Sequence, residues 1–260
     1  TGQIIAKNAA DTLKHVSFEL GGKSPNIVFD DYDLEDAVSA AMGGVFVAAG
    51  QTCVAGSRLF LHEKIHDEFL ERLVSRARKV RVGDPLQQET QMGAQTCEQQ
   101  WNKIQELVQS GVNEGAEILV GGIPPEGKDL SEGFFFTPTV FSGVEHDMRI
   151  AQEEIFGPVI STFKFSDEDE LVERANAVKY GLGGGVWTRD LKRAIRVSRR
   201  IKAGTVWINC YRKIHWAVPF GGYKMSGYGR ENGQEVMDLY TQTKTIWMDL
   251  TEHQANPYAN

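Results

Sequence analysis

The chain has 260 residues, of which 41% are hydrophobic and 24% are charged, and its formal net charge at pH 7 is −7. This composition is typical of a globular protein with one large or two small domains, and the acidic balance argues against a nucleic-acid surface. Its apolar runs fall short of the roughly 18 residues that a membrane span needs, and residues 1–10 do not resemble a signal peptide. The three cysteines, an odd number, argue against a disulfide scaffold and favour the cytoplasm.

The spacing of apolar residues predicts strands that alternate with helices. The predicted strands cover residues 16–20, 26–29, 58–61, 117–120, 134–141, 159–165, 183–187, 205–209 and 243–250. The predicted helices cover the amino terminus and residues 34–46, 65–80, 101–108, 167–178, 191–201 and 235–240, with Asp33 as an N-cap. This alternation predicts an α/β fold with an open, mostly parallel sheet and helices on both faces.

Three further stretches have their own signals. Pro138 interrupts the strand at 134–141 and predicts that it lies at an edge or a bulge. Residues 121–133, rich in glycine, proline and acids, are expected to form a surface excursion, and residues 251–260 a polar tail.

Cys53 is the first candidate for chemistry. It lies among small and polar residues in the stretch GQTCVAGSR, just after the apolar segment 34–49. Gly50 and Gly56 could open the backbone to an approaching molecule. The pattern suits a nucleophilic thiol, but it also suits a buried cysteine in a glycine-containing turn. Cys210, at a strand end, and Cys97, in a polar segment, are the competing thiols.

Glu19 is the second candidate. It stands between apolar residues directly before Gly21 and Gly22. A carboxylate in such surroundings can have a raised pKa and act as a general base. The same pattern also describes a strand-end residue whose carboxylate lies in solvent.

The two segments, ELGGKSPN from Glu19 and GQTC ending at Cys53, lie 34 positions apart and resemble the aldehyde dehydrogenase superfamily. Four further segments continue the resemblance in the order of the family, over essentially the whole chain. These segments are QEEIFGP at 152–158, YGL at 180–182, GTVWIN at 204–209 and PFGGYKMSG at 219–227.

The resemblance implies a role for each matching residue. Cys53 would be the nucleophile, and Glu19 the base that activates the hydrolytic water. The cofactor, NAD or NADP, would be contacted by Glu154, Phe156, Lys103, Gln100 and Gly21. Phe220 and Tyr211 would line the substrate pocket, while Asn209 would tie its strand end to the Glu19 segment and Lys23 would be structural. Without the resemblance, Glu154 and Phe156 equally suit a helix-capping acid and a core phenylalanine. No metal ligand is assigned.

The resemblance also implies a domain organisation. Residues 1–21 would end a dinucleotide-binding domain, residues 22–227 would form the catalytic domain, and residues 228–260 would carry an oligomerisation strand. The chain would then be the carboxyl-terminal half of a longer protein, inactive alone, that forms a homodimer or homotetramer. The alternative is a short natural protein.

The expected reaction is the NAD(P)-dependent oxidation of an aldehyde to a carboxylate, through a thiohemiacetal and a thioester on Cys53. The alternatives are a coenzyme A-acylating semialdehyde dehydrogenase, a non-catalytic structural relative, and a thiol hydrolase that uses His62 or His66. Arg212, Lys213 and His215 favour a polar or anionic aldehyde, unless they simply face solvent.

Overall fold

Seven strands form one sheet in the computed structural model, which describes residues 1–127, 130, 132–252 and 257–258. Their order across the sheet is β3–β4–β5–β2–β1–β7–β8, and every neighbouring pair is parallel except β3 with β4. The strands are β1 (Pro25–Val28), β2 (Arg58–His62), β3 (Glu117–Val120), β4 (Thr139–Ser142), β5 (Val159–Phe165), β7 (Gly183–Trp187) and β8 (Thr205–Ile208). A separate antiparallel pair joins β6 (Tyr180–Gly181) to β9 (Tyr223–Lys224). The predicted open, mostly parallel α/β sheet is confirmed.

The helices follow the predicted periodicity closely. They are α1 (Gly2–Ala10), α2 (Leu34–Val45), the 3₁₀ turn η1 (Val47–Gly50), α3 (His66–Ala77), α4 (Glu98–Asn113), α5 (Arg149–Gln152), α6 (Glu168–Asn176), α7 (Leu191–Arg200) and α8 (Val236–Tyr240). Asp33 caps α2, as predicted, by accepting a hydrogen bond from the Asp36 amide at 3.0 Å.

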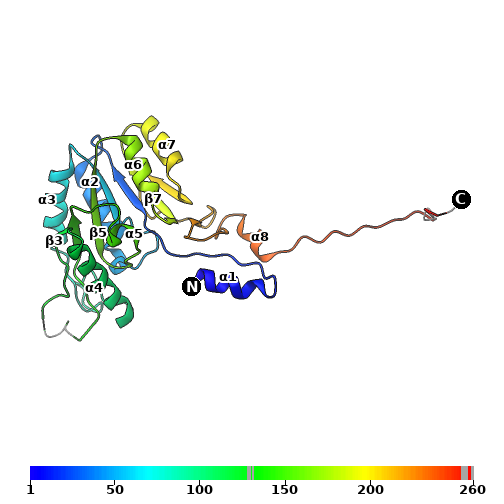
Figure 1. The fold of residues 1–260 in the computed structure, drawn as a ribbon, viewed down its shortest axis with the longest axis horizontal. Coiled ribbons are helices and arrows are strands. Elements are labelled where there is room, and N and C mark those ends of the chain that lie inside the picture. Colours follow the sequence, from blue (N-terminus) through cyan, green and yellow to red (C-terminus); the bar gives the residue numbers. More distant parts are fainter. Residues whose placement is uncertain (128–129, 131, 253–256, 259–260) are drawn as a thin grey trace.

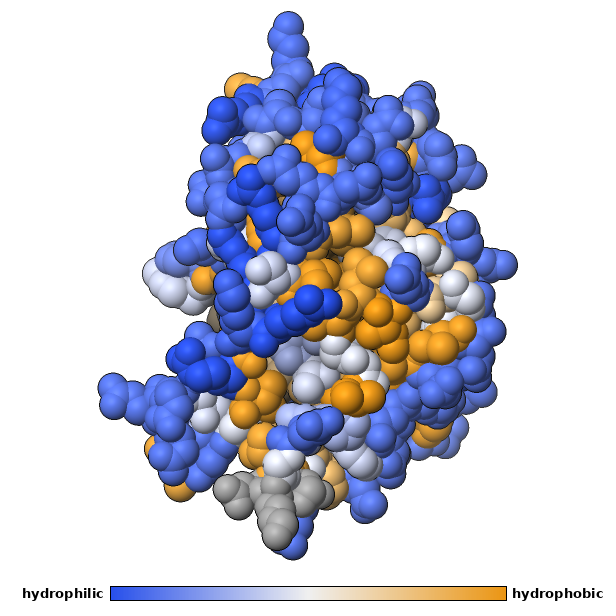
Figure 2. Space-filling model, turned by 90° about the vertical axis from the view of Figure 1, so that its left-hand side faces the viewer, coloured by the Kyte–Doolittle hydropathy of each residue, from blue (hydrophilic) through white to orange (hydrophobic). Residues whose placement is uncertain are grey.

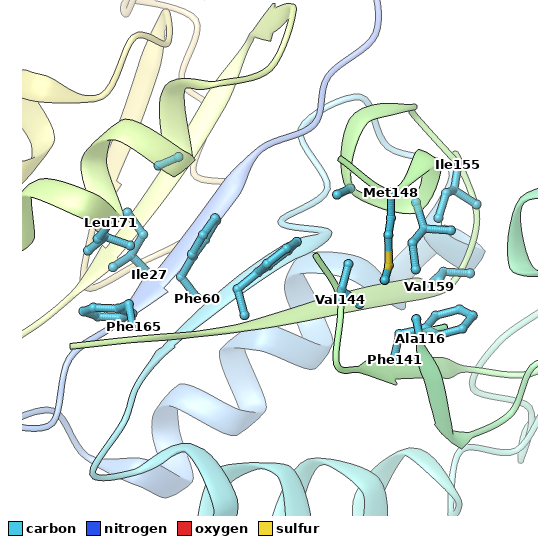
Figure 3. Packing of buried hydrophobic residues seen from close by; sticks show 14 of the residues in the cluster. Ile27, Phe60, Ala116, Phe141, Val144, Met148, Ile155, Val159, Phe165 and Leu171 are labelled. Atoms are coloured by element: carbon cyan, nitrogen blue, oxygen red, sulfur yellow. The ribbon is translucent and has the colours of Figure 1, made fainter. Parts of the chain in front are cut away.

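Two hydrophobic cores lie on opposite faces of the sheet. Because successive side chains of a strand point to opposite faces, Ile27 belongs to one core and Val28 to the other. The first core packs the sheet against α4, α5, α6 and α7, and Figure 3 shows part of it around Phe60. The second core packs the sheet against α2 and α3. The prediction that helices cover both faces is therefore confirmed.

The strand predicted at 16–20 is wrong. This segment donates only two backbone hydrogen bonds to its neighbour, from Phe18 to the Tyr228 carbonyl at 2.9 Å and from Leu20 to the Ser226 carbonyl at 3.1 Å. Between these acceptors, Gly227 has φ +113°, which is far from extended backbone and stops a regular ladder.

The prediction for 134–141 also needs correction. The strand β4 begins at Thr139, directly after Pro138, so the missing proline N–H lies outside the ladder. β4 therefore pairs on both sides, with β3 and with β5, and does not form an edge. The irregularity lies in β3, where the register shifts between Ile118 and Val120.

Residues 243–250 are extended, but no described segment pairs with them, so the predicted strand does not form. A strand needs a neighbour for its backbone hydrogen bonds. Figure 1 shows this stretch leading away from the body of the molecule, and α1 lying apart from the sheet. The surface excursion at 121–133 and the tail at 251–260 fall partly outside the described residues.

The opposite end of the molecule, beside α3 and α4, has a mixed surface. Figure 2 shows apolar side chains gathered at the centre of this face, with hydrophilic side chains around them. None of the helices in the described ranges combines the length and apolar character needed to cross a membrane.

Candidate functional site

Cys53 lies in a tight turn between η1 and β2. The amide of Thr52 donates to the Gly50 carbonyl at 2.9 Å, and the amide of Ala55 donates to the Thr52 carbonyl at 3.0 Å. Burial of the half-buried thiol raises the pKa of Cys53, and the Glu154 and Glu19 carboxylates raise it further. The thiol form is therefore favoured, so thiolate chemistry at Cys53 requires a proton acceptor.

Gly50 does not open the turn to another molecule, as the sequence suggested. A β-carbon at Gly50 would collide with the backbone of Gly157 and Pro158, so the missing side chain makes room for the chain itself. Gly56 likewise faces Asn26 and Tyr211. The turn is thereby held against the segment that carries Glu154 and Phe156.

A small apolar cluster surrounds the thiol. Val54, Leu182 and Trp207 form its buried centre, and Cys53 packs against it. Cys210, Tyr211 and Phe220 pack against the same centre. The structure thus brings the predicted nucleophile together with both predicted pocket residues. Cys97, directly before α4, is exposed and lies outside this cluster.

Glu19 lies on the irregular segment that pairs with residues 226–228. Partial burial raises the pKa of Glu19 to about 7, although the residue as a whole stays exposed. The Glu231 carboxylate raises this pKa further, and the Arg230 guanidinium lowers it. A carboxyl group with this pKa can both accept and release a proton near neutral pH.

The segment that carries Glu19 and the Cys53 turn meet at Gly22. A β-carbon at Gly22 would collide with the Cys53 carbonyl, which shows how closely the two backbones approach. The Gly22 amide also donates to Glu154 Oε1 at 3.0 Å. One residue therefore joins three segments that lie far apart in the sequence.

Glu154 and Gly21 line a common cavity of about 390 Å³ between α1 and the body of the molecule. A β-carbon at Gly21 would collide with Glu154 Oε2, so glycine is needed to leave this oxygen in place. Burial raises the pKa of Glu154, while the Gly22 amide, Lys103 and Lys23 lower it. Tyr180 and Tyr228 complete much of the cavity wall.

Gln100 and Lys103 approach this region from α4. The Gln100 amide donates to the carbonyls of Ile155 at 2.8 Å and Phe156 at 3.0 Å. These two bonds hold the backbone of Phe156, which has a left-handed φ of +56°. Gln100 therefore fixes the backbone of the segment that follows Glu154. Lys103 contributes positive charge near Glu154.

Lys23 and Arg58 are two buried cations beside the site. Lys23 is 1% exposed and its Nζ has no hydrogen-bond partner among the described residues. Arg58 donates to the carbonyls of Lys23, Arg174 and Ala175 at 2.9, 3.0 and 2.6 Å. This fork ties the start of β1 and β2 to the end of α6. The structural role of Lys23 itself stays a prediction.

The side chain of Asn209 has a different hydrogen-bond partner from the expected one, and its structural role stays a prediction. Its side-chain amide bonds Thr188 in both directions, accepting from the amide at 3.0 Å and donating to the carbonyl at 2.9 Å. The residue thus joins the ends of β7 and β8 and does not reach the Glu19 segment.

Sequence analysis missed Glu231 and Arg230, which act on Glu19 electrostatically. They lie more than 200 positions from Glu19, and only the pairing of residues 18–20 with 226–228 brings them close. Local sequence patterns carry no signal of such a contact.

The histidines offered for a thiol hydrolase lie away from the thiol. His62 ends β2, whereas Cys53 precedes the start of this strand, and five strand residues span about 16 Å. His66 bonds Asp67 at 2.7 Å. Among the described residues, no group of three or more His, Cys, Asp or Glu side chains could hold a metal ion.

Comparison with known proteins gives a consistent result. The model of the aldehyde dehydrogenase family matches residues 1–246. Betaine aldehyde dehydrogenase of Brucella anthropi is 49% identical over 250 residues, which cover 96% of this chain and 51% of the relative. The chain thus spans about half the length of the curated relatives it matches.

Solved structures extend this similarity to the fold. Betaine aldehyde dehydrogenase of Staphylococcus aureus, solved in complex with NAD⁺, has a TM-score of 0.96 at 41% identity. The match covers 100% of this chain and 52% of the S. aureus chain. An NAD⁺ complex of aldehyde dehydrogenase from Bacillus cereus has a TM-score of 0.92 at 43% identity, covering 96% and 50%. Since the family model matches nearly the whole chain, this protein belongs to the aldehyde dehydrogenase family.

Proposed function

We propose that this chain supplies the nucleophile and the base for the NAD(P)-dependent oxidation of an aldehyde to a carboxylate. Cys53 attacks the carbonyl carbon and Glu19 activates the water that releases the acid. The observation that carries this proposal is the junction at Gly22, where the Cys53 turn, the Glu19 segment and Glu154 meet.

The residues around the 390 Å³ cavity suit a nicotinamide nucleotide. Gly21 makes room for the Glu154 side chain, whose carboxylate suits a sugar hydroxyl as donor. The backbone of Phe156, two residues beyond Glu154, is held in place by the hydrogen bond from Gln100. NAD is the first candidate because the S. aureus and B. cereus structures were solved with NAD⁺.

The side chains divide the reaction between them. The sulfur of Cys53 bonds to the aldehyde carbon while the thiol proton passes to the carbonyl oxygen, forming a thiohemiacetal. The bound nicotinamide supplies the hydride acceptor, a chemistry that no side chain offers. After oxidation, the acyl group remains on Cys53 as a thioester. Glu19, with a pKa of about 7, takes a proton from water as the water oxygen bonds to the acyl carbon. The carbon–sulfur bond then breaks, the acid leaves, and the proton held by Glu19 returns to the sulfur.

The carboxylate of Glu19 also bears on the rival functions. A coenzyme A-acylating enzyme passes its thioester to a thiol and has no need of a base for water. A structural relative has no need of either group. The pairing of a thiol with a base tuned near neutral pH therefore favours hydrolysis.

A cofactor-free assay tests the first half of this proposal. The chain is mixed with an activated ester such as 4-nitrophenyl acetate, and intact-mass spectrometry follows the acylation of Cys53. We expect an acyl adduct at Cys53 that hydrolyses with turnover. A chain that forms no adduct is not a thiol enzyme, and release of the adduct only on addition of coenzyme A identifies the acylating alternative.

The aldehyde itself is tested by a panel with NAD or NADP. Betaine aldehyde, a cation, is the first arm because relatives at 49–50% identity are betaine aldehyde dehydrogenases. Anionic aldehydes form the second arm because Arg212, Lys213 and His215 add positive charge after Tyr211. Lys213 and His215 are exposed, whereas Arg212 donates to the Gly43 carbonyl at 3.3 Å, so this charge lies mostly at the surface.

Assembly and organisation complete the proposal. Ile246, Trp247, Met248 and Leu250 are exposed along the extended segment 243–250, with Trp247 93% exposed. Such a segment can add a strand to a second copy, giving a homodimer or homotetramer. Residues 1–21, 22–227 and 228–260 would then serve cofactor binding, catalysis and assembly. Light scattering after size-exclusion chromatography tests the assembly, and a monomer at micromolar concentration contradicts it. A reducing cytoplasm suits the free thiol.

A further inference from the structure

Three glycines from three different elements surround the ring of Tyr211. A β-carbon at Gly44 on α2 would lie 3.3 Å from ring Cδ1, and one at Gly56 would lie 3.0 Å from the hydroxyl oxygen. A β-carbon at Gly185 on β7 would lie only 2.6 Å from Cε2, closer than atoms can pack. The ring therefore fills space that exists only because these three positions lack side chains.

The hydroxyl at the end of this ring interacts with the Val54 carbonyl and with the Ser24 side chain. It donates to the Val54 carbonyl at 2.9 Å, and Val54 itself is buried. Burial raises the pKa of Tyr211, so the hydroxyl remains protonated and a donor across the physiological range. An acceptor buried in this way needs such a partner.

Val54 acts on Cys53 from its other end. The backbone amides of Val54 and of Cys53 itself both lower the pKa of the Cys53 thiol, against the effect of burial. The same residue thus has its carbonyl fixed by Tyr211 and its amide directed at the sulfur.

We propose that Tyr211 is a positioning residue for Cys53, whose hydroxyl anchors the Val54 carbonyl and keeps the Val54 amide aimed at the sulfur. This role rests on the proposed function only in naming Cys53 as the nucleophile. It replaces direct substrate contact by Tyr211, because the ring is enclosed by Gly44, Gly56 and Gly185.

The substitution Tyr211→Phe isolates the hydroxyl, because the ring still fills the glycine cradle. The rate of alkylation by iodoacetamide is measured from pH 6 to 10, and peptide mass spectrometry resolves Cys53 from the exposed Cys97. We expect the midpoint of the Cys53 alkylation profile to move to higher pH by about half to one unit. At a fixed pH below the midpoint, this corresponds to a roughly three- to tenfold slower reaction. The Cys97 profile is expected to stay unchanged. A folded Tyr211→Phe variant whose Cys53 profile overlays the wild type overturns the proposal.

Two further variants separate positioning from packing. Tyr32→Phe removes a hydroxyl from a partly buried tyrosine that packs on Trp187, and the Cys53 profile is expected to remain at the wild-type position. An equal shift in Tyr32→Phe would overturn the proposal, since any lost hydroxyl would then suffice.

Gly44→Ala keeps the Tyr211 hydroxyl but places a methyl group against the ring. We expect the Cys53 alkylation profile to move to higher pH, as in Tyr211→Phe. The shift should not increase in the double variant Gly44→Ala/Tyr211→Phe, because both act through one hydrogen bond. Additive shifts overturn the proposal. The assay uses neither cofactor nor aldehyde. A Tyr211 effect in a chain whose Cys53 forms no acyl adduct with 4-nitrophenyl acetate would therefore refute the proposed function and leave this inference standing.

Discussion

The Gly22 amide donates a hydrogen bond of 3.0 Å to Glu154 Oε1, although 132 positions separate the two residues. The Cys53 carbonyl lies against the same glycine. Through this junction, the Cys53 turn and the Glu19 segment hold a fixed position relative to the Glu154 carboxylate. Substitutions at Cys53 and at Glu19 should therefore have separable effects, the first on acylation and the second on hydrolysis.

Replacing Cys53 by alanine should abolish ester hydrolysis by the chain, because no nucleophile remains to form the thioester. We expect at least a hundredfold loss of turnover with 4-nitrophenyl acetate, on the order of other lost nucleophiles. The matched control is Cys97→Ala, which removes an exposed thiol outside the Val54 cluster. Near-wild-type turnover in Cys53→Ala would remove Cys53 from the reaction.

Replacing Glu19 by glutamine should slow hydrolysis of the thioester more than its formation. The acyl adduct on Cys53 should then accumulate and be visible by intact-mass spectrometry. In the wild-type chain, hydrolysis should accelerate as pH rises through about 7, because only the ionised Glu19 accepts a proton. This rise in the hydrolysis rate near pH 7 should be absent in Glu19→Gln.

Glu71→Gln on α3 serves as the control for Glu19, because it removes an exposed carboxylate remote from the site. If no adduct accumulates in Glu19→Gln and the rise in rate with pH persists, another group activates the water.

Replacing Lys23 by methionine should stabilise the fold, most strongly at low pH. Burial lowers the pKa of Lys23 from 10.5 to about 7. Between these values the unfolded chain binds more protons than the native chain, so the stability of the wild type rises with pH across this window. Below pH 7 the native state carries a buried charge at full cost. Methionine of similar volume should therefore raise the free energy of unfolding by roughly 1–4 kcal/mol at pH 6.

The gain in Lys23→Met should shrink toward pH 10, where the wild-type amine is neutral in the native state. Urea unfolding at several pH values measures this difference. Lys7→Met on α1 is the exposed control, with a difference near zero throughout. A loss of stability in Lys23→Met at every pH would show that the amine is an essential cation in this position.

Replacing Arg58 by lysine should destabilise the fold although the charge is kept. A lysine cannot reproduce the planar fork that binds the carbonyls of Lys23, Arg174 and Ala175. At least two buried acceptors would lose their donors, which costs about 2–4 kcal/mol. Arg196→Lys alters an exposed pair with Glu168 and should leave the urea midpoint close to that of the wild type. Equal urea midpoints for the two variants would contradict this account of Arg58.

The sequence by itself determined the order and type of nearly all elements of the sheet. The bounds of β3, β5 and β7 agree with the predicted ranges, and Asp33 caps α2 as expected. These features depend on apolar periodicity and on hydrogen bonds between residues a few positions apart, so a short window of sequence contains them. Cys53 and Glu19 were singled out because their segments resemble those of a known family, and their catalytic roles remain predictions.

The tertiary structure alone decided what depends on distant partners. The segments 16–20 and 243–250 have strand-like sequences, but the first faces Gly227 and the second has no described neighbour, so neither forms a regular ladder. Gly50 was expected to admit another molecule and instead admits the backbone of Gly157. The ring of Tyr211 occupies a cradle whose glycines come from α2, the Cys53 turn and β7. Each of these contacts joins residues far apart in the sequence, and the free energy of such packing depends on shapes that only the folded chain brings together.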